Sequence, residues 1–171
     1  QFGNYVNYIL SLNSEVNIVF IPHMYKDIEI ISNVLNFIRD DYRRNRISVA
    51  PLLNGTLNGG DYIFSLYKKL DFALGMRFHS NVCAIGLNVP NIGLITYHKH
   101  GYLFDEINLP DRALNVKEEG FFDKLTYKTI EDLGRLYEIR ENYKKINEKL
   151  EKDIYEFHLK VKQWLTENKV I

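Results

Sequence analysis

The sequence predicts a doubly wound α/β fold with a mostly parallel sheet, and three observations lead to this fold class. Short apolar runs rich in β-branched residues recur along the chain. Stretches with helical periodicity follow them, and this alternation is typical of a parallel sheet covered on both faces. The chain has 171 residues, 46% of them hydrophobic, which is enough to bury one core. A long helical segment is expected at the C-terminal end.

The first strand-and-helix pair is expected near the N-terminus. Residues 5–12, "YVNYILSL", carry apolar side chains at mixed spacing and suit a helix entering from a preceding domain. Residues 16–21 form a short, mostly apolar run that is typical of a strand buried on both faces. Asp27 can cap the helix that follows, where Ile31 and Leu35 fall on one face.

Three further strands are expected in the middle of the chain. Residues 46–53, "RISVAPLL", are the second strand, and the turn "NGTLNGG" at 54–60 leads to a helix with Asp61 near its start. Residues 71–75, "DFALG", are the third strand, followed by the helix "FHSNVCAIGL". Residues 90–97, "PNIGLITY", are the fourth.

The domain organisation follows from this order and from a change of composition toward the C-terminus. We expect residues 1–15 to be an interdomain linker or helix, residues 16–127 the α/β lobe, and residues 128–171 a C-terminal helical segment. In this segment apolar and aromatic residues recur at steps of three and four. They are Tyr143, Ile146, Leu150, Ile154, Phe157, Val161 and Trp164. We expect this face to pack against its own chain, and a coiled coil is the alternative.

Charge and cysteine content restrict the partners and the compartment. The 22 basic and 22 acidic residues balance, so the chain has no overall field that would attract nucleic acid or an anionic membrane. A single cysteine, Cys83, excludes an internal disulfide framework and suits a reducing compartment. No apolar run approaches the roughly 18 residues of a membrane-spanning helix, and no leader opens the chain. We therefore expect a cytoplasmic protein. Because the chain begins with Gln1, we also expect a preceding domain.

Titratable side chains follow three of the expected strands. In a parallel sheet the loops after the strands open toward one edge, where helices begin with unpaired N–H groups and ligands bind. The residues at these ends are His23, Asp27, Gly75, Arg77, His79, Tyr97 and Lys99. We expect the three loops to converge on this edge, and an anion bound there would explain the cationic groups.

The stretch "GMRFHS" carries the clearest chemistry. Gly75 permits close backbone approach or an unusual dihedral angle, and Arg77 offers a planar fork of donors to a carboxylate or phosphate. A helix that begins near Phe78 adds the positive end of its dipole. His79 can exchange a proton near neutral pH. The set suits an anionic substrate that undergoes proton transfer. In the alternative, Arg77 bonds carbonyls at the strand end and His79 only begins the helix.

The stretch "DFALGMRFHSNVCAIGLNVPNIGLITYHKHGYLFDEINLP" resembles the signature region of the polysaccharide pyruvyl transferase family. In that region an Asp, a short strand and Gly-Met-Arg-x-His lead into a helix, and a Val-Pro strand and a Tyr-x-Lys loop follow. The upstream "VFIPHMYKD" matches the family's Pro-His and Asp, so the resemblance covers residues 16–110. It implies two Rossmann-like lobes around a cleft, similar to GT-B glycosyltransferases. It also implies transfer of the enolpyruvyl unit of phosphoenolpyruvate onto paired sugar hydroxyls as a cyclic ketal.

The resemblance also implies roles for individual residues. By motif match, His79 would be the catalytic acid or base, Arg77 would hold the donor's phosphate or carboxylate, and Lys99 would contact phosphate. The expected substrate-binding residues are Arg77, Lys99, Gly75, His23 and Tyr97. The implied partners are phosphoenolpyruvate, a saccharide or lipid-linked saccharide acceptor reached by peripheral contact with a membrane, and an N-terminal lobe of the same parent chain.

Two functions of other classes fit the same pattern. A GT-B glycosyltransferase or nucleotide-sugar lobe has the same order of elements, with Glu118 or Glu119 as ribose contacts. A non-catalytic assembly domain would use the C-terminal helix as a docking face if Tyr143, Phe157 and Trp164 formed one exposed patch. The "HKH" triplet lacks cysteine or carboxylate at ligand spacing, so we expect no metal, and we expect no cofactor.

Overall fold

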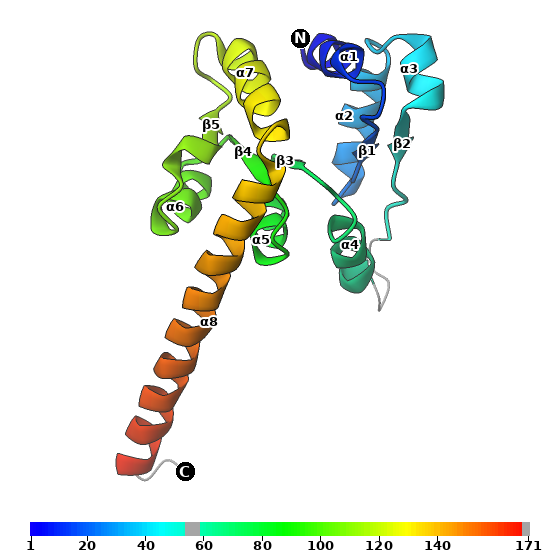
Figure 1. Ribbon diagram of the computed structural model, residues 1–171. Helices are drawn as coiled ribbons and strands as arrows, with labels where there is room; N and C mark the ends of the chain where they lie inside the picture. Colours follow the sequence, from blue (N-terminus) through cyan, green and yellow to red (C-terminus); the bar gives the residue numbers. More distant parts are fainter. Residues whose placement is uncertain (54–58, 169–171) are drawn as a thin grey trace. The chain divides into compact units, whose positions relative to one another are not determined.

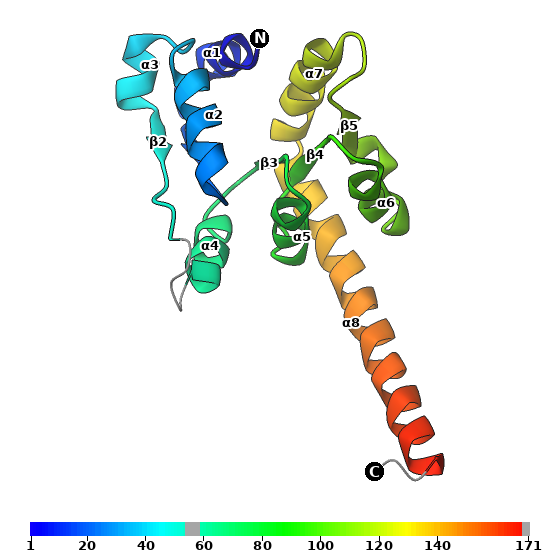
Figure 2. The ribbon, with the colours of Figure 1, turned by 180° about the vertical axis from the view of Figure 1, so that it is seen from behind.

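The computed structural model describes residues 1–53 and 59–168, and these form alternating strands and helices (Figures 1 and 2). The α/β class, the parallel strand pairs and the long C-terminal helix predicted from the sequence are confirmed. Most of the predicted turn at 54–60 lies outside the described residues. The chain divides into two compact units: residues 1–70 with 114–134, and residues 71–113 with 135–171.

The first unit contains a parallel strand pair and five helices among its described residues. Its elements are α1 (Phe2–Leu12), β1 (Ile18–Phe20), α2 (Tyr25–Leu35), α3 (Asp40–Asn45), β2 (Ile47–Val49), α4 (Gly59–Tyr67) and α7 (Phe121–Leu133). Strand β1 lies parallel to β2, with Ile18 opposite Ile47. Helices α1 and α7 are joined by a hydrogen bond of 2.8 Å between the hydroxyls of Tyr5 and Thr129. Burial raises the pKa of Tyr5 to about 12, so this hydroxyl stays protonated.

The second unit is built around strands β3 and β4 and carries the long helix. Its elements are β3 (Ala73–Gly75), α5 (Phe78–Gly86), β4 (Asn91–Ile95), α6 (His98–Glu106), the 3-10 helix η1 (Pro110–Arg112) and α8 (Leu136–Glu167). The short β5 (Ala113–Asn115) lies beside β4, and the boundary between the units falls within it. The buried core joins α5, α6 and the first turns of α8 through Ile85, Phe104, Ile139 and Tyr143.

Strand pairing joins two of the three strands whose loops were expected to converge at one edge. In the described residues, β1 pairs with β2 in one sheet, and β3, β4 and β5 form another. The pairing therefore brings together only the loops that follow β3 and β4. Alternating apolar runs predict parallel strands, but they carry no information about which strand lies beside which. The loop after β1, with His23, belongs to the first unit.

The predicted packing of the C-terminal helix is correct only for its first turns. Tyr143 is fully buried and Ile146 is partly buried. The remaining residues of the predicted face are 37–61% exposed: Leu150, Ile154, Phe157, Val161 and Trp164. Helical periodicity predicts an apolar face but not a partner for it. The 32 residues of α8 span about 48 Å, whereas the nine residues of α5, which packs against it, span about 14 Å. Helix α5 is therefore too short to cover the whole apolar face of α8.

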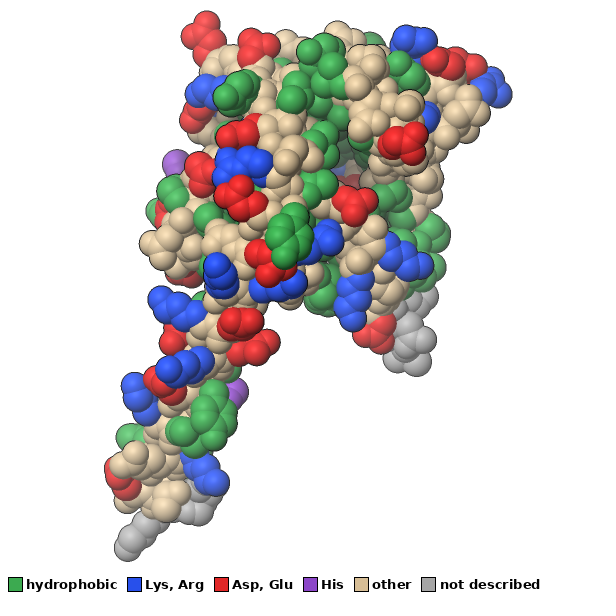
Figure 3. Space-filling model, in the orientation of Figure 1, with side chains coloured by type: hydrophobic (Ala, Val, Ile, Leu, Met, Phe, Trp, Pro, Cys, Tyr) green, Lys and Arg blue, Asp and Glu red, His purple; other side chains and the backbone are tan. Residues whose placement is uncertain are grey.

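The surface is mixed in charge on the face that Figure 3 displays, where acidic and basic side chains are interspersed. This agrees with the balanced composition of the chain. Among the described helices, α8 included, none combines the length and the apolar composition needed to cross a membrane.

Candidate active site

Strands β3 and β4 end next to each other, and each leads directly into a helix. They run parallel, and Gly75, the last residue of β3, lies opposite Gly93. Helix α5 begins at Phe78 and α6 at His98. Both are nine-residue helices that begin at this edge of the sheet, where the positive ends of the helix dipoles favour an anion.

The first turn of α5 is fixed by local hydrogen bonds around Arg77. The Ser80 hydroxyl accepts a hydrogen bond from the Arg77 N–H at 3.1 Å and donates one to the Arg77 carbonyl at 2.5 Å. The buried Asn81 amide donates to the carbonyls of Gly75 (3.0 Å) and Arg77 (3.2 Å). The backbone that carries Arg77 is therefore held at both ends by buried side chains.

Gly75 is required for the close approach of a side chain. A Cβ at this position would lie 2.6 Å from Cγ of Asn81, a distance that real Cβ atoms do not show. Gly75 is not among the described residues with positive φ. Of the two explanations that the sequence left open, the structure therefore favours close approach, and the approaching group is the Asn81 amide.

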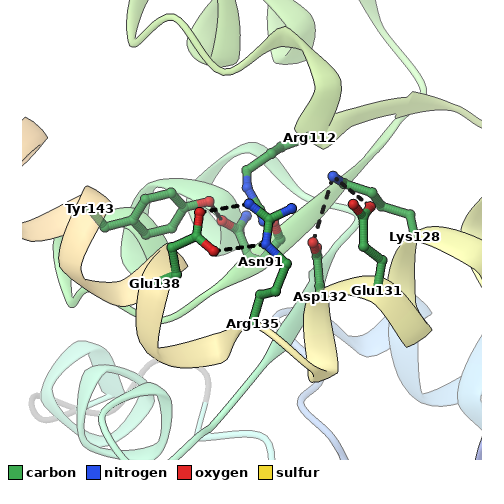
Figure 4. A network of polar contacts seen from close by, with 8 residues as sticks. All are labelled: Asn91, Arg112, Lys128, Glu131, Asp132, Arg135, Glu138 and Tyr143. Atoms are coloured by element: carbon green, nitrogen blue, oxygen red, sulfur yellow. Dashed lines mark hydrogen bonds and ion pairs between the residues drawn. The ribbon is translucent and has the colours of Figure 1, made fainter.

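Asn81 in turn belongs to a buried polar network centred on Asn91. Figure 4 shows three other members of this network, Asn91, Arg112 and Tyr143. The Asn91 amide donates to Oδ1 of Asn81 at 2.9 Å, and its own Oδ1 accepts a hydrogen bond of 2.7 Å from the Tyr143 hydroxyl. The Arg112 guanidinium donates to the Asn91 carbonyl at 2.7 Å and lies 5.8 Å from the Tyr143 ring centroid. All four side chains are at least 96% buried. The network ties β4, η1 and α8 to the loop that carries Arg77.

The sequence interpretation missed the supporting role of this network. The helical pattern predicts only an apolar face for Tyr143, and it predicts no role for Asn81, Asn91 or Arg112. One signal was present, because Asn91 is a polar residue within the otherwise apolar stretch of the fourth strand. A buried amide needs hydrogen-bond partners, so such a position indicates a network.

The predicted site residues of the second unit all lie at the ends of β3 and β4. Arg77 is the N-cap residue of α5, and His79 is exposed in the first turn, with its ring centroid 5.8 Å from that of Phe78. Tyr97 is the N-cap residue of α6 and is 69% exposed, and Lys99 is exposed in the following turn. The side chains of His79, Tyr97 and Lys99 are thus exposed at the same edge, and Arg77 is partly exposed there.

The other predicted residues belong to the first unit. Nε2 of His23 lies 3.3 Å from the Tyr67 hydroxyl. The Asp27 carboxylate accepts hydrogen bonds from the N–H groups of His23 (2.9 Å) and Met24 (3.1 Å). It therefore bonds backbone at the start of α2, but from the third helical position, because α2 begins earlier than predicted and Met24 is its N-cap residue. A role for His23 in substrate binding stays a prediction.

Two further kinds of site can be assessed in the part of the chain that the structure describes. No group of three or more His, Cys, Asp or Glu side chains there is arranged to hold a metal ion. Cys83 is buried, and burial raises the pKa of its thiol. A protonated, buried thiol is a poor nucleophile.

Two parallel strands that lead into adjacent helix N-termini, with Arg and Lys at the same edge, define an α/β domain of the kind that binds anionic substrates. The family described as polysaccharide pyruvyl transferase matches residues 4–99, more than half of the chain. The chain belongs to the polysaccharide pyruvyl transferase family, and the resemblance noted in the sequence is confirmed. No curated protein and no solved structure was found to match. The family gives the general function: enzymatic pyruvyl transfer in polysaccharide biosynthesis, with a saccharide as acceptor.

Proposed function

We propose that this chain supplies the donor-binding part of an enzyme that transfers the pyruvyl unit of phosphoenolpyruvate to two saccharide hydroxyls as a ketal. The observation that carries the proposal is the position of Arg77, His79 and Lys99. All three lie within the family match, and all three lie in the first turns or caps of α5 and α6 at the ends of adjacent strands.

The first step requires an acid, which we assign to His79. Transfer of its proton to the methylene carbon of phosphoenolpyruvate makes a methyl group and leaves an oxocarbenium-like centre at C2. A saccharide hydroxyl adds to C2 and loses its proton to a base. His79, which is neutral after the first proton transfer, can serve as this base. The exposed position of His79 in the first turn of α5 is compatible with both transfers.

The second step requires stabilisation of a leaving phosphate. The C2–O bond to phosphate breaks, phosphate departs with the bonding electrons, and a second hydroxyl closes the ketal at C2 with loss of its proton. Fixed positive charge at the departing group lowers this barrier without reorganisation. Arg77, Lys99 and the N-termini of α5 and α6 are the groups that we assign to this task.

The assignment extends to partners outside the described site. We propose a lipid-linked or free saccharide as the acceptor, reached by peripheral contact where it is membrane-bound, and a second, N-terminal lobe of the parent chain that completes the cleft. A cytoplasmic location suits the supply of phosphoenolpyruvate.

The two rival functions receive less support. The nucleotide-sugar alternative needs a carboxylate for ribose, but Glu118 forms an exposed ion pair of 2.6 Å with Lys124. The docking alternative needs Tyr143 exposed beside Phe157 and Trp164, and Tyr143 is fully buried.

Thermal-shift titrations with phosphoenolpyruvate and with UDP-sugars separate the donor classes. We expect stabilisation by phosphoenolpyruvate, and stabilisation by UDP-sugars alone would overturn the proposal.

Arg77→Lys should raise the KM for phosphoenolpyruvate roughly tenfold to a hundredfold, with a much smaller change in kcat. Lysine keeps the charge but cannot reproduce the bidentate fork, and a lost hydrogen bond to a charged group is worth about 1.5–3 kcal/mol. Steady-state kinetics at saturating acceptor measures both constants. The matched control is Arg44→Lys, an exposed arginine of α3 paired with Asp40, which should change neither constant. An unchanged donor KM in Arg77→Lys would remove Arg77 from the site.

A further inference from the structure

His100 is a buried imidazole with an unused polar atom. It lies in the first turn of α6 and is only 6% exposed. Its Nδ1 is the one buried side-chain nitrogen or oxygen without a hydrogen-bond partner among the residues that the structure describes. Such an atom makes the folded state less stable, and an apolar ring of similar size would avoid that cost. The arrangement is explained if a ligand supplies the missing partner.

The surroundings of His100 place it within the candidate active site. Its ring centroid lies 5.9 Å from that of Phe78, the first residue of α5, and 6.0 Å from that of Tyr97, the N-cap residue of α6. The other neighbour of the Phe78 ring is His79, at 5.8 Å. His100 is therefore separated from the proposed catalytic histidine by one aromatic ring, between the starts of the two helices.

Tyr97 is the more exposed of the two aromatic neighbours of His100. The Tyr97 side chain is 69% exposed, so it can change rotamer without disturbing the core, and exposed side chains do so within nanoseconds. Rotation of Tyr97 would remove one of the two rings that contact the imidazole. Phe78, which is half-buried at the start of α5, would remain as its other wall.

We propose that His100 is a further residue that binds the pyruvyl donor. Its Nδ1 donates a hydrogen bond to the carboxylate or to the phosphate of that molecule. The inference rests on the proposed function, because it takes phosphoenolpyruvate as the ligand of this edge. It goes beyond the family match, which ends at Lys99. Burial and the positive charge of Lys99 lower the pKa of His100, so its imidazole is neutral at neutral pH. A neutral ring with its proton on Nδ1 adds a directed donor beside the charged Arg77 and Lys99.

His100→Phe separates a binding role from a structural one. Phenylalanine keeps the ring packing against Phe78 and Tyr97 and removes the polar atom. The melting temperature should stay unchanged or rise, since an unsatisfied buried group is replaced by an apolar one. The Kd for phosphoenolpyruvate, measured by calorimetry, should increase roughly tenfold to a hundredfold, as expected for a lost hydrogen bond to a charged ligand. His98→Phe, an exposed position in the same turn, is the control and should bind as the unmodified protein does.

The outcomes distinguish this inference from the function on which it rests. Unchanged phosphoenolpyruvate affinity in His100→Phe would overturn the role of His100 while the proposed donor stands. Absence of phosphoenolpyruvate binding to the unmodified protein would overturn the donor assignment and this inference with it. A lower melting temperature together with unchanged affinity would assign His100 to the core alone. Inorganic phosphate and pyruvate, titrated separately, identify the end of the donor that contacts His100, because only that fragment loses affinity in His100→Phe.

Discussion

His79→Gln should lower kcat roughly a hundredfold to ten-thousandfold in the active protein, the usual contribution of a positioned general acid. Glutamine retains hydrogen bonding to the bound donor, but it cannot deliver a proton to carbon. The loss should appear in kcat and in kcat/KM alike, because the proton is transferred only on the way to the transition state. The KM for phosphoenolpyruvate should change little, in contrast to Arg77→Lys.

Steady-state kinetics of ketal formation gives this result directly, and His158→Gln is the control. His158 lies in the exposed part of α8, and its replacement should leave both constants unchanged. A His79→Gln variant that turns over at the normal rate but binds the donor weakly would make His79 a ligand contact. The acid would then have to be another residue.

Gly75→Ala should be among the most destabilising single methyl additions in the second unit. The new Cβ overlaps with the Asn81 amide, which is fully buried and hydrogen-bonded to Gly75, Arg77 and Asn91. Overpacking costs about 1–3 kcal/mol, and each buried hydrogen bond left unsatisfied costs about 1–3 kcal/mol more. We therefore expect a loss of roughly 3–6 kcal/mol in the free energy of unfolding, measured by urea denaturation, and a loss of donor binding.

Gly86→Ala is the matched control, because a Cβ at the last residue of α5 meets no atom within 4 Å. It should leave the unfolding midpoint unchanged or raise it slightly. A double-mutant cycle tests the cause of the Gly75→Ala effect. In the background of Asn81→Ala the clash partner is absent, so Gly75→Ala should add little further destabilisation. Full additivity of the two changes would contradict the proposed clash.

The sequence predicted the fold class because apolar runs and helical periodicity are local signals. Strands β1, β2, β3 and β4 and helix α5 lie within the predicted stretches. Helices α2 and α4 begin a few residues earlier than predicted, and α6 begins within the expected Tyr-x-Lys loop. Pairing is not a local signal. It joins the third and fourth strands in one sheet, and the convergence of the loop after the first strand with the other two stays a prediction. The same limit applies to α8, whose apolar face was predicted correctly while its packing beyond Ile146 was not.

The candidate site, like the fold, can be predicted from the sequence only in part. Arg77, His79 and Lys99 could be selected from the sequence because their chemistry is carried by a short motif. The groups that hold this motif in place, Asn91 and Tyr143, are 52 residues apart and meet only in the folded chain. Nor does residue type reveal that the His100 ring is buried with an unpartnered nitrogen, since the exposed His98 lies two positions earlier.

Phosphoenolpyruvate should bind where β3 and β4 end, and hydrogen–deuterium exchange in the presence of ligand shows where it binds. With phosphoenolpyruvate, the amides of residues 76–80 and 97–100 should exchange more slowly, because the ligand engages the first N–H groups of α5 and α6. UDP-sugars should leave these amides unchanged. Protection of these residues by UDP-sugars, or protection by phosphoenolpyruvate only elsewhere in the chain, would contradict the account.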